Sequence, residues 1–486
     1  MCLQRTKQSR RTAGSAWRRP RVPLSAQRIV AASSDLKLLL KTLSRFGVTL
    51  QKSIKYAILV GTLGSGWFGL SPYEDITVLP AGHWISFDSR GMNLCEYSES
   101  SQPELTLDDA LHALAQEWAK NCQIVADATG TVCIAHLTGG FDSRLVLAAM
   151  RSAGVDRGFS YYCSGQAGEP EFDSSRRLCA SLSLTPTDDS GYAEENLSES
   201  WEEHLWGAFA WTEGVVSSPA TIWGVQTPGI VLSGGGREIL RSFYNKGESV
   251  FNSPDRITEH MFDSFAMGKS GSQSILSEPM KSLIYEGLEN EHHRASEKGI
   301  RSAAQLDYLY LTGRNRYYVG EISRSFSRFI PRFDPLYSPF AAKIALNLDG
   351  EIRNSNLLGL RALGRLDSLL AALPFDSERY AQTYIDIYGN PARAAFRTTL
   401  RVPTPVQYAA QKPGQQKWAL PQPTTQQHEF AKKLKMPPRL VPQFEYIQKR
   451  INPMLDLLDQ SELSQVLDVD YLRGLIRKPP ANRVGY

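Results

Sequence analysis

The chain has 486 residues, of which 42% are hydrophobic and 21% are charged, as in an ordinary folded protein. This length favours two domains with appendages over a single hydrophobic core. No apolar run approaches the roughly 18 residues that a membrane span requires, so we expect no membrane partner.

The basic charge is concentrated at the N-terminus. The formal net charge is +4, and residues 1–34 contain eight Lys and Arg side chains and no acid, so the remainder carries about −4. This pattern predicts a disordered tail over residues 1–33 or a misplaced start codon, with a transit peptide or a nucleic-acid or membrane contact as alternatives. For the mildly acidic remainder we expect no nucleic-acid partner.

The six cysteines and eight histidines show no metal-binding spacing. No two cysteines form a C-x-x-C pair, and Cys133 and Cys163 lie in strand-like apolar runs. The histidines form no H-E-x-x-H motif. We therefore expect reduced cysteines, a cytoplasmic location and no zinc site.

Residues 34–98 are typical of a small α+β unit. Leucines recur at helical spacing over residues 35–46, and residues 84–87 alternate as a strand does. A second strand over 92–97 would close a hairpin, and residues 98–107 have the composition of a linker.

Residues 106–184 alternate between helical and strand-like patterns. A helix over 106–125 precedes an apolar strand over 132–137, and a second strand over 158–163 precedes a helix over 171–184. This order predicts a right-handed parallel α/β unit, in which ligands bind at the carboxyl ends of the strands.

Two glycine turns follow strand-like runs. Gly139 and Gly140 end the first run, and Asp142 or Ser143 can cap the next helix. Residues 229–241 repeat this pattern of strand, small residues and helix. Because glycines admit a phosphate close to the backbone and a helix N-terminus attracts its charge, two such turns on one sheet predict a nucleotide site.

The remaining segments are mainly helical in pattern. We predict helices within 192–226 and 255–375 and at 428–435 and 454–477, with an extended Pro- and Gln-rich loop at 402–427.

Three segments carry a resemblance to a known family. Leu137-Thr-Gly-Gly-Phe-Asp-Ser143 resembles the S-G-G-x-D-S pyrophosphate loop of the asparagine synthetase type of ATP pyrophosphatases, the PP-loop superfamily. Val231-Leu-Ser-Gly-Gly-Gly-Arg-Glu238 resembles their second motif, L-S-G-x-G-x-D-E, shortened by one residue. Residues 34–98, including Leu79-Pro-Ala-Gly-His83, are similar to the second half of the glutaminase domain that precedes the synthetase domain in this family.

The resemblance implies the fold class and the domains. The expected fold is α/β, a parallel-sheet ATP pyrophosphatase domain of the adenine nucleotide alpha hydrolase type with helical additions, at residues 106–375. A partial α+β N-terminal-nucleophile amidotransferase-like domain precedes it at 34–98, and a helical and extended extension follows at 376–486.

The resemblance also implies the chemistry. A carboxylate is activated by ATP and Mg²⁺ as an acyl-adenylate, pyrophosphate leaves, and an amine or ammonia then forms an amide. By resemblance, the nucleotide-contacting residues are Leu137, Thr138, Gly139, Gly140, Ser143, Tyr162, Ser233 and Gly234, of which Leu137 and Tyr162 or its neighbour border the adenosine. Asp142 would hold Mg²⁺, and Glu238 matches the glutamate linked to formation of the acyl-adenylate.

The chain departs from the family pattern at several positions. Arg237 replaces an aspartate that is a second Mg²⁺ ligand, so that Arg237 binds phosphate itself or Glu238 takes over the metal. The late catalytic lysine has no clear match beyond Lys412 or Lys417. Cys2 stands where the glutaminase nucleophile would, but Leu3 follows it and the glutamine site is missing, as a truncated gene start would also explain.

One helical segment offers a further catalytic pair. Tyr317 and Glu321 stand four residues apart on a predicted helix and could share one face. The resemblance gives this pair a possible role, since β-lactam-forming relatives use a Tyr and Glu pair as the base for an internal amine. The alternative is a packed face of aromatic and arginine side chains.

The sequence thus predicts an asparagine synthetase-like, AMP-forming amide ligase, with a small-molecule or peptide carboxylate and an amine or ammonia as partners and a possible homodimer. Its product would be asparagine or a specialised amide. The alternatives are a lasso-type peptide macrolactam cyclase without glutaminase activity, and a non-catalytic nucleotide-binding or partner protein.

Overall fold

The computed structural model describes most of the two regions that the sequence singles out. The described residues are 2–5, 30–88, 91–96, 106–128, 132–163, 168–186, 210, 212–215, 229–244, 256, 278–327, 331–373, 375, 423–434, 438, 441–458, 461, 464, 467, 469–470 and 473–474.

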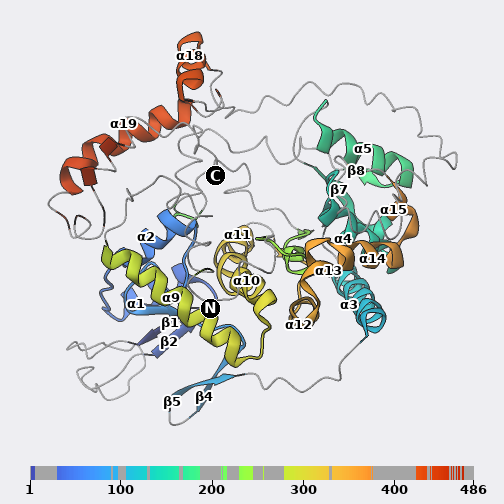
Figure 1. Ribbon diagram of the computed structural model, residues 1–486, viewed down its shortest axis with the longest axis horizontal. Helices are drawn as coiled ribbons and strands as arrows, with labels where there is room; N and C mark the ends of the chain where they lie inside the picture. Colours follow the sequence, from blue (N-terminus) through green and yellow to red (C-terminus); the bar gives the residue numbers. More distant parts are fainter. Residues whose placement is uncertain are drawn as a thin grey trace.

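A five-stranded parallel sheet organises the larger region. Its order is β10-β9-β6-β7-β8, and every adjacent pair is parallel. The chain runs outward from β6 to β8 and then returns to β9 on the other side of β6, so the order reverses between β6 and β9 (Figure 1). Ligands of open α/β sheets bind outside the carboxyl ends of the strands at such a reversal. The strands are β6 (Val132–His136), β7 (Ser160–Tyr162), β8 (Thr185–Pro186), β9 (Gly229–Leu232) and β10 (Arg332–Phe333).

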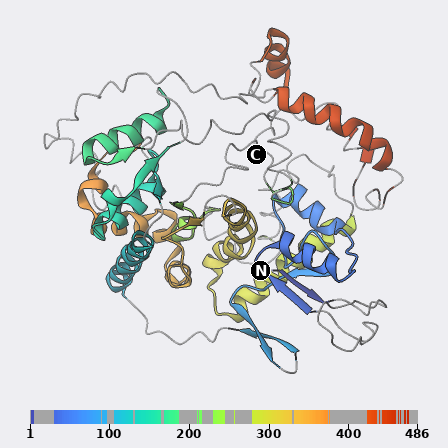
Figure 2. The same ribbon diagram turned by 180° about the vertical axis from the view of Figure 1, so that it is seen from behind.

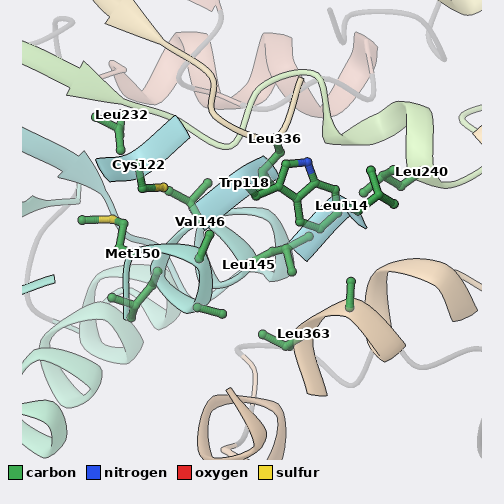
Figure 3. Close-up of a cluster of buried hydrophobic side chains, with 14 of the residues drawn as sticks. Leu114, Trp118, Cys122, Leu145, Val146, Met150, Leu232, Leu240, Leu336 and Leu363 are labelled. Carbon is green, nitrogen blue, oxygen red and sulfur yellow. The ribbon is translucent and has the colours of Figure 1, made fainter. Parts of the chain in front are cut away.

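One face of this sheet is covered by helices α3 (Leu107–Asp127), α4 (Phe141–Ser152) and α14 (Leu357–Leu366). Trp118 and Leu114 of α3 are fully buried, and Thr106 caps that helix by accepting from the amide of Asp109. Figure 3 shows side chains of α3 and α4 packed with Leu232 of the sheet and Leu363 of α14. The predicted α/β class and the predicted helix over 106–125 are confirmed.

The N-terminal unit contains a three-stranded antiparallel sheet of order β2-β1-β3. The predicted hairpin is confirmed as β4 and β5, and the predicted first helix as α1. The prediction of a disordered tail over 1–33 is wrong at both ends, because β1 and β2 pair with each other; residues 6–29 lie outside the described residues. The elements are β1 (Cys2–Arg5), β2 (Val30–Ser33), α1 (Leu36–Arg45), α2 (Ile54–Leu63), β3 (Ile76–Val78), β4 (His83–Asp88) and β5 (Gly91–Glu96).

This unit shares a hydrophobic core with the helices of the larger region. Ile58, Leu59 and Trp67 pack with residues of α9 (Glu278–Glu297) and α10 (Ser302–Tyr310), and both views place the blue unit against α9 (Figures 1 and 2). A Cβ on Gly313 would lie 2.1 Å from the Trp67 ring, so the indole packs directly on the backbone there. Burial of this apolar surface joins the two regions.

The remaining elements are helical, apart from the short strand β10, which the sequence did not reveal. The predicted helix over 454–477 is wrong in position, since α19 begins at Val441 and ends at Leu458. The predicted loop at 402–427 lies mainly outside the described residues, as does most of 192–226. None of the described helices is long and apolar enough to cross a bilayer. The elements not yet given are the 3₁₀ helix η2 (Asp156–Gly158), α5 (Pro170–Leu182), the 3₁₀ helix η3 (Arg237–Leu240), the π-helix η5 (Leu311–Val319), α11 (Gly320–Phe326), α12 (Pro339–Asn347), α13 (Gly350–Asn354), α15 (Ser368–Ala372) and α18 (Thr425–Leu434).

Candidate functional site

The first glycine turn joins β6 to α4 and is closed by its own hydroxyl groups. Ser143 Oγ accepts from the amide of Thr138 at 3.0 Å and lies 3.1 Å from Thr138 Oγ1, which accepts from the amide of Gly140 at 3.2 Å. The prediction that Asp142 or Ser143 caps the helix is wrong, because α4 begins at Phe141 with Gly140 in the N-cap position and no side-chain cap. Helix α4 therefore begins directly after the turn without a side-chain cap, and the N-terminus of a helix attracts anions.

The second turn follows β9 and, like the first, spans four residues, here 233–236. Ser233 Oγ accepts from the amide of Gly235 at 3.2 Å, and Gly236 has a φ of +78°, which favours glycine. Only the four residues of η3 follow, so this turn does not open a long helix.

The two turns touch each other. A Cβ on Gly234 would lie 2.9 Å from the carbonyl carbon of Asp142 and 3.0 Å from its Cβ, so only glycine permits this approach. Both turns follow strands of one sheet, as the sequence predicts, and they meet where the strand order reverses, between β6 and β9.

A charged pair from the neighbouring strand borders the second turn. Arg332 Nε lies 3.2 Å from Asp334 Oδ1, and Ser323 Oγ donates to the other carboxylate oxygen of Asp334 at 3.3 Å. A Cβ on Gly235 would lie 2.5 Å from Arg332 Nη2 and 2.8 Å from Asp334 Oδ1. The sequence analysis missed this pair because β10 is only two residues long. The available signal was that Asp334 follows Arg332-Phe333 in the same way as Ser233 follows Val231-Leu232.

His136 and Tyr162 end neighbouring strands in register, with ring centroids 5.4 Å apart. Burial, and then the positive charge of Arg332, lowers the pKa of His136 to about 4, against an opposing effect of Asp334. His136 is therefore neutral at pH 7. Leu137 donates its amide to the carbonyl of Tyr162 at 2.8 Å and its side chain is fully buried in the core, so only its backbone faces the turn.

Glu238 is the second residue of η3, directly after the second turn, and its charge acts on Tyr310 of α10. Burial, and then the charge of Glu238, raises the pKa of Tyr310 in that helix. Arg237 begins η3, and its side chain lies outside the described set.

Tyr317 and Glu321 each have a structural partner. Tyr317 Oη accepts from the amide of Gly69 in the N-terminal unit at 2.8 Å, and burial raises the pKa of this tyrosine. Glu321 Oε2 accepts from Arg324 Nε at 2.8 Å. These contacts favour the packed aromatic and arginine face over a catalytic pair. Cys2 begins β1, while Lys412 and Lys417 lie outside the described residues.

Asp142 lies where the two turns meet, whereas Asp334, which borders the second turn, is already paired with Arg332. In the described ranges, no three His, Cys, Asp or Glu side chains gather as a metal site. Mg²⁺ usually keeps several waters and takes one or two carboxylates plus substrate phosphates, so a single aspartate in the first turn of α4 fits Mg²⁺ held jointly with a phosphate.

A separate groove lies between the N-terminal unit and α9. Its lining includes Lys52, Lys55 and Glu286 and none of the residues at the carboxyl ends of the parallel strands. No protein-family model and no curated protein matches the chain. The geometry of the sheet edge is therefore the basis for a functional argument.

Proposed function

We propose that the chain is an ATP-dependent, AMP-forming amide ligase whose nucleotide binds where the two glycine turns meet. The contact between Gly234 and Asp142 carries this proposal, because it brings both turns to the carboxyl ends of adjacent strands at the reversal of strand order. The uncapped N-terminus of the twelve-residue helix α4 adds backbone N–H groups and the positive end of a dipole at the same point.

The reaction takes place in two steps. A carboxylate oxygen of the substrate attacks the α-phosphorus of ATP, the bond from that phosphorus to the bridging oxygen breaks, and pyrophosphate leaves with the electron pair. An amine then attacks the acyl carbon, AMP leaves, and the amine loses a proton. Asp142 would hold Mg²⁺ together with the phosphates, and the bound cation would neutralise charge on the leaving group.

The residues of the first turn would bind the pyrophosphate. The hydroxyl network of Thr138 and Ser143 fixes the turn before the nucleotide arrives, so little reorganisation is needed at the moment of reaction. Ser233 and Gly234 would contact the nucleotide from the other side, and Tyr162 and the backbone of Leu137 would border the adenosine.

The N-terminal unit favours a ligase that takes its amine without hydrolysing glutamine. Trp67, Gly69 and Leu79 of this unit all contact the helical segment at 313–317, so they support those helices. A free amine or ammonia would then be the acceptor, and a specialised amide, such as the macrolactam of a lasso-type peptide, fits this better than asparagine made from glutamine.

A nucleotide-binding protein without catalysis is the second candidate. Its support is the position of Glu238 near Tyr310 and the replacement of an expected acid by Arg237. Such a protein would bind ATP at the same two turns but would not activate a carboxylate.

One assay separates these functions. ATP–pyrophosphate exchange is measured with candidate acids and peptides for the native chain, for Asp142→Ala and for Asp127→Ala, an exposed aspartate at the end of α3. The ligase predicts acid-dependent exchange that only Asp142→Ala abolishes. ATP binding without exchange for any acid would support the non-catalytic protein, and exchange requiring aspartate would favour asparagine synthesis over peptide cyclisation.

A further inference from the structure

Arg332 reaches the second turn from the neighbouring strand. In register, Arg332 pairs with Val231 and Phe333 with Leu232, and the carbonyl of Phe333 accepts from the amide of Ser233 at 3.0 Å. Parallel strands in register place paired residues on the same face of the sheet. Arg332 therefore lies on the same face of the sheet as Val231 and Ile134. His136 lies two residues beyond Ile134 on that face and is paired with Tyr162.

Among the residues that the structure describes, Asp334 holds the guanidinium of Arg332 through Nε. Arg332 Nε pairs with Asp334 at 3.2 Å, and both side chains are largely buried, with exposed fractions of 15% and 17%. Within the described part of the chain, no hydrogen-bond partner faces the two terminal nitrogens of Arg332. Nη2 lies beside Gly235, where the missing side chain leaves room for the guanidinium.

The charge of Arg332 also acts across β9 toward the first turn. Arg332 is among the causes that lower the pKa of His136, the residue at the end of β6 just before the first turn. Because His136 is neutral at pH 7, Arg332 is the cation that faces this edge from β10, and the second turn has only a four-residue helix whose dipole is too short to supply a comparable charge.

We propose that Arg332 binds an oxoanion at this edge, the pyrophosphate portion of the nucleotide, and that Asp334 is its positioning residue. This inference rests on the proposed function and assigns a protein cation to its nucleotide site. Arginine presents a planar fork of donors that matches phosphate oxygens two at a time, and a cation held in place before binding stabilises the charge that builds on leaving pyrophosphate.

The test is calorimetric titration of the full chain with inorganic pyrophosphate and with ATP, each in the presence of Mg²⁺. The variants are Arg332→Ala, Arg332→Lys and Asp334→Asn, with Arg301→Ala as the control, since Arg301 pairs with Asp349 on the surface. Arg332→Ala should raise the Kd for pyrophosphate about tenfold to a hundredfold, as for loss of a charged hydrogen bond. The Kd of Arg332→Lys for pyrophosphate should lie between those of Arg332→Ala and the native chain.

Two further readouts separate binding from mere structural support. Added guanidinium ion should restore part of the pyrophosphate affinity of Arg332→Ala and none of that of Asp334→Asn, in which the arginine remains. Circular dichroism of each variant checks that it folds. If Arg332→Ala does not fold, the Kd of Arg332→Lys for pyrophosphate decides the test.

The outcomes distinguish the two proposals. If the native chain binds neither pyrophosphate nor ATP, the proposed function fails. If the native chain binds both and the folded Arg332 variants bind them with unchanged Kd, the role of Arg332 is overturned and the proposed function stands. A loss in Arg332→Ala that guanidinium does not restore would also overturn direct contact.

Discussion

The two glycine turns occupy equivalent places at the ends of adjacent strands, yet they are built differently. The first opens the twelve-residue helix α4 and is closed by hydroxyl groups of Thr138 and Ser143. The second is followed by the four-residue 3₁₀ helix η3 and packs against Arg332, Asp334 and the ring of Tyr337. The first turn therefore has a helix dipole of its own, whereas the second depends on charged side chains from β10.

This difference bears on the proposed nucleotide site, of which the second turn would form one half. The second turn lacks room for side chains at three successive positions, since added Cβ atoms there would meet Asp142, Arg332 and Tyr337. Glycines at 234–236 are therefore required by close packing. The turn has no room for charged side chains of its own, and those of Arg332 and Asp334 lie beside it. Variants of each turn test whether the two halves act together.

The largest effect is expected from Asp142→Asn in the first turn. The substitution keeps size and removes the negative charge that would hold Mg²⁺, so ATP–pyrophosphate exchange should fall about a hundredfold to a thousandfold. The fall should be steeper at low Mg²⁺ concentration. Exchange that is unchanged at every Mg²⁺ concentration would remove Asp142 from the proposed metal site.

A steric change at the contact between the turns should come next. Gly234→Val would drive its side chain into the backbone of Asp142 and should lower the free energy of unfolding by about 3 kcal/mol, as for overpacking of a tight interior. The matched control is Gly158→Val, because a Cβ on Gly158 would meet nothing within 4 Å. Urea unfolding of both variants measures the difference, and equal stabilities would contradict the close approach.

The sequence predicted the first turn better than the second, for physical reasons. The strand and helix around Thr138–Ser143 are long enough for hydrophobic periodicity to show, and so are α3 and the hairpin β4–β5. Arg332 and Asp334 could not be found in this way, because a strand of two residues has no period and its partner β9 lies about a hundred residues away along the chain. The same limit applies to Trp67 and Gly313, whose contact depends on tertiary packing alone.

A pH effect should follow from His136, which ends β6 just before the first turn. Burial, and then Arg332, holds the pKa of His136 in the folded state at about 4, below the ordinary value of 6.5. The unfolded chain therefore binds the proton more readily, so stability is full above pH 6.5 and is lost as the pH falls toward 4. At pH 5 the loss from this group should be about 2 kcal/mol.

The measurement compares urea unfolding at pH 7 and pH 5 for the native chain and for His136→Gln, which has no titrating imidazole. The variant should lose less stability between the two pH values than the native chain does. His428→Gln, in the exposed helix α18, is the control and should behave like the native chain. An equal loss of stability in all three proteins would mean that burial does not lower the pKa of His136.

The smallest effect is expected from replacing the serine that closes each turn. Ser143→Ala removes the acceptor of the Thr138 amide and a contact with its hydroxyl, whereas Ser233→Ala removes one acceptor, that of the Gly235 amide. Each net hydrogen bond contributes about 1 kcal/mol, so Ser143→Ala should cost more stability than Ser233→Ala. If the turns act together on a nucleotide, the double variant should weaken ATP affinity by more than the two single losses combined, because one rigid turn still orders its neighbour through Gly234 and Asp142. Additive losses would mean that the two turns bind the nucleotide independently.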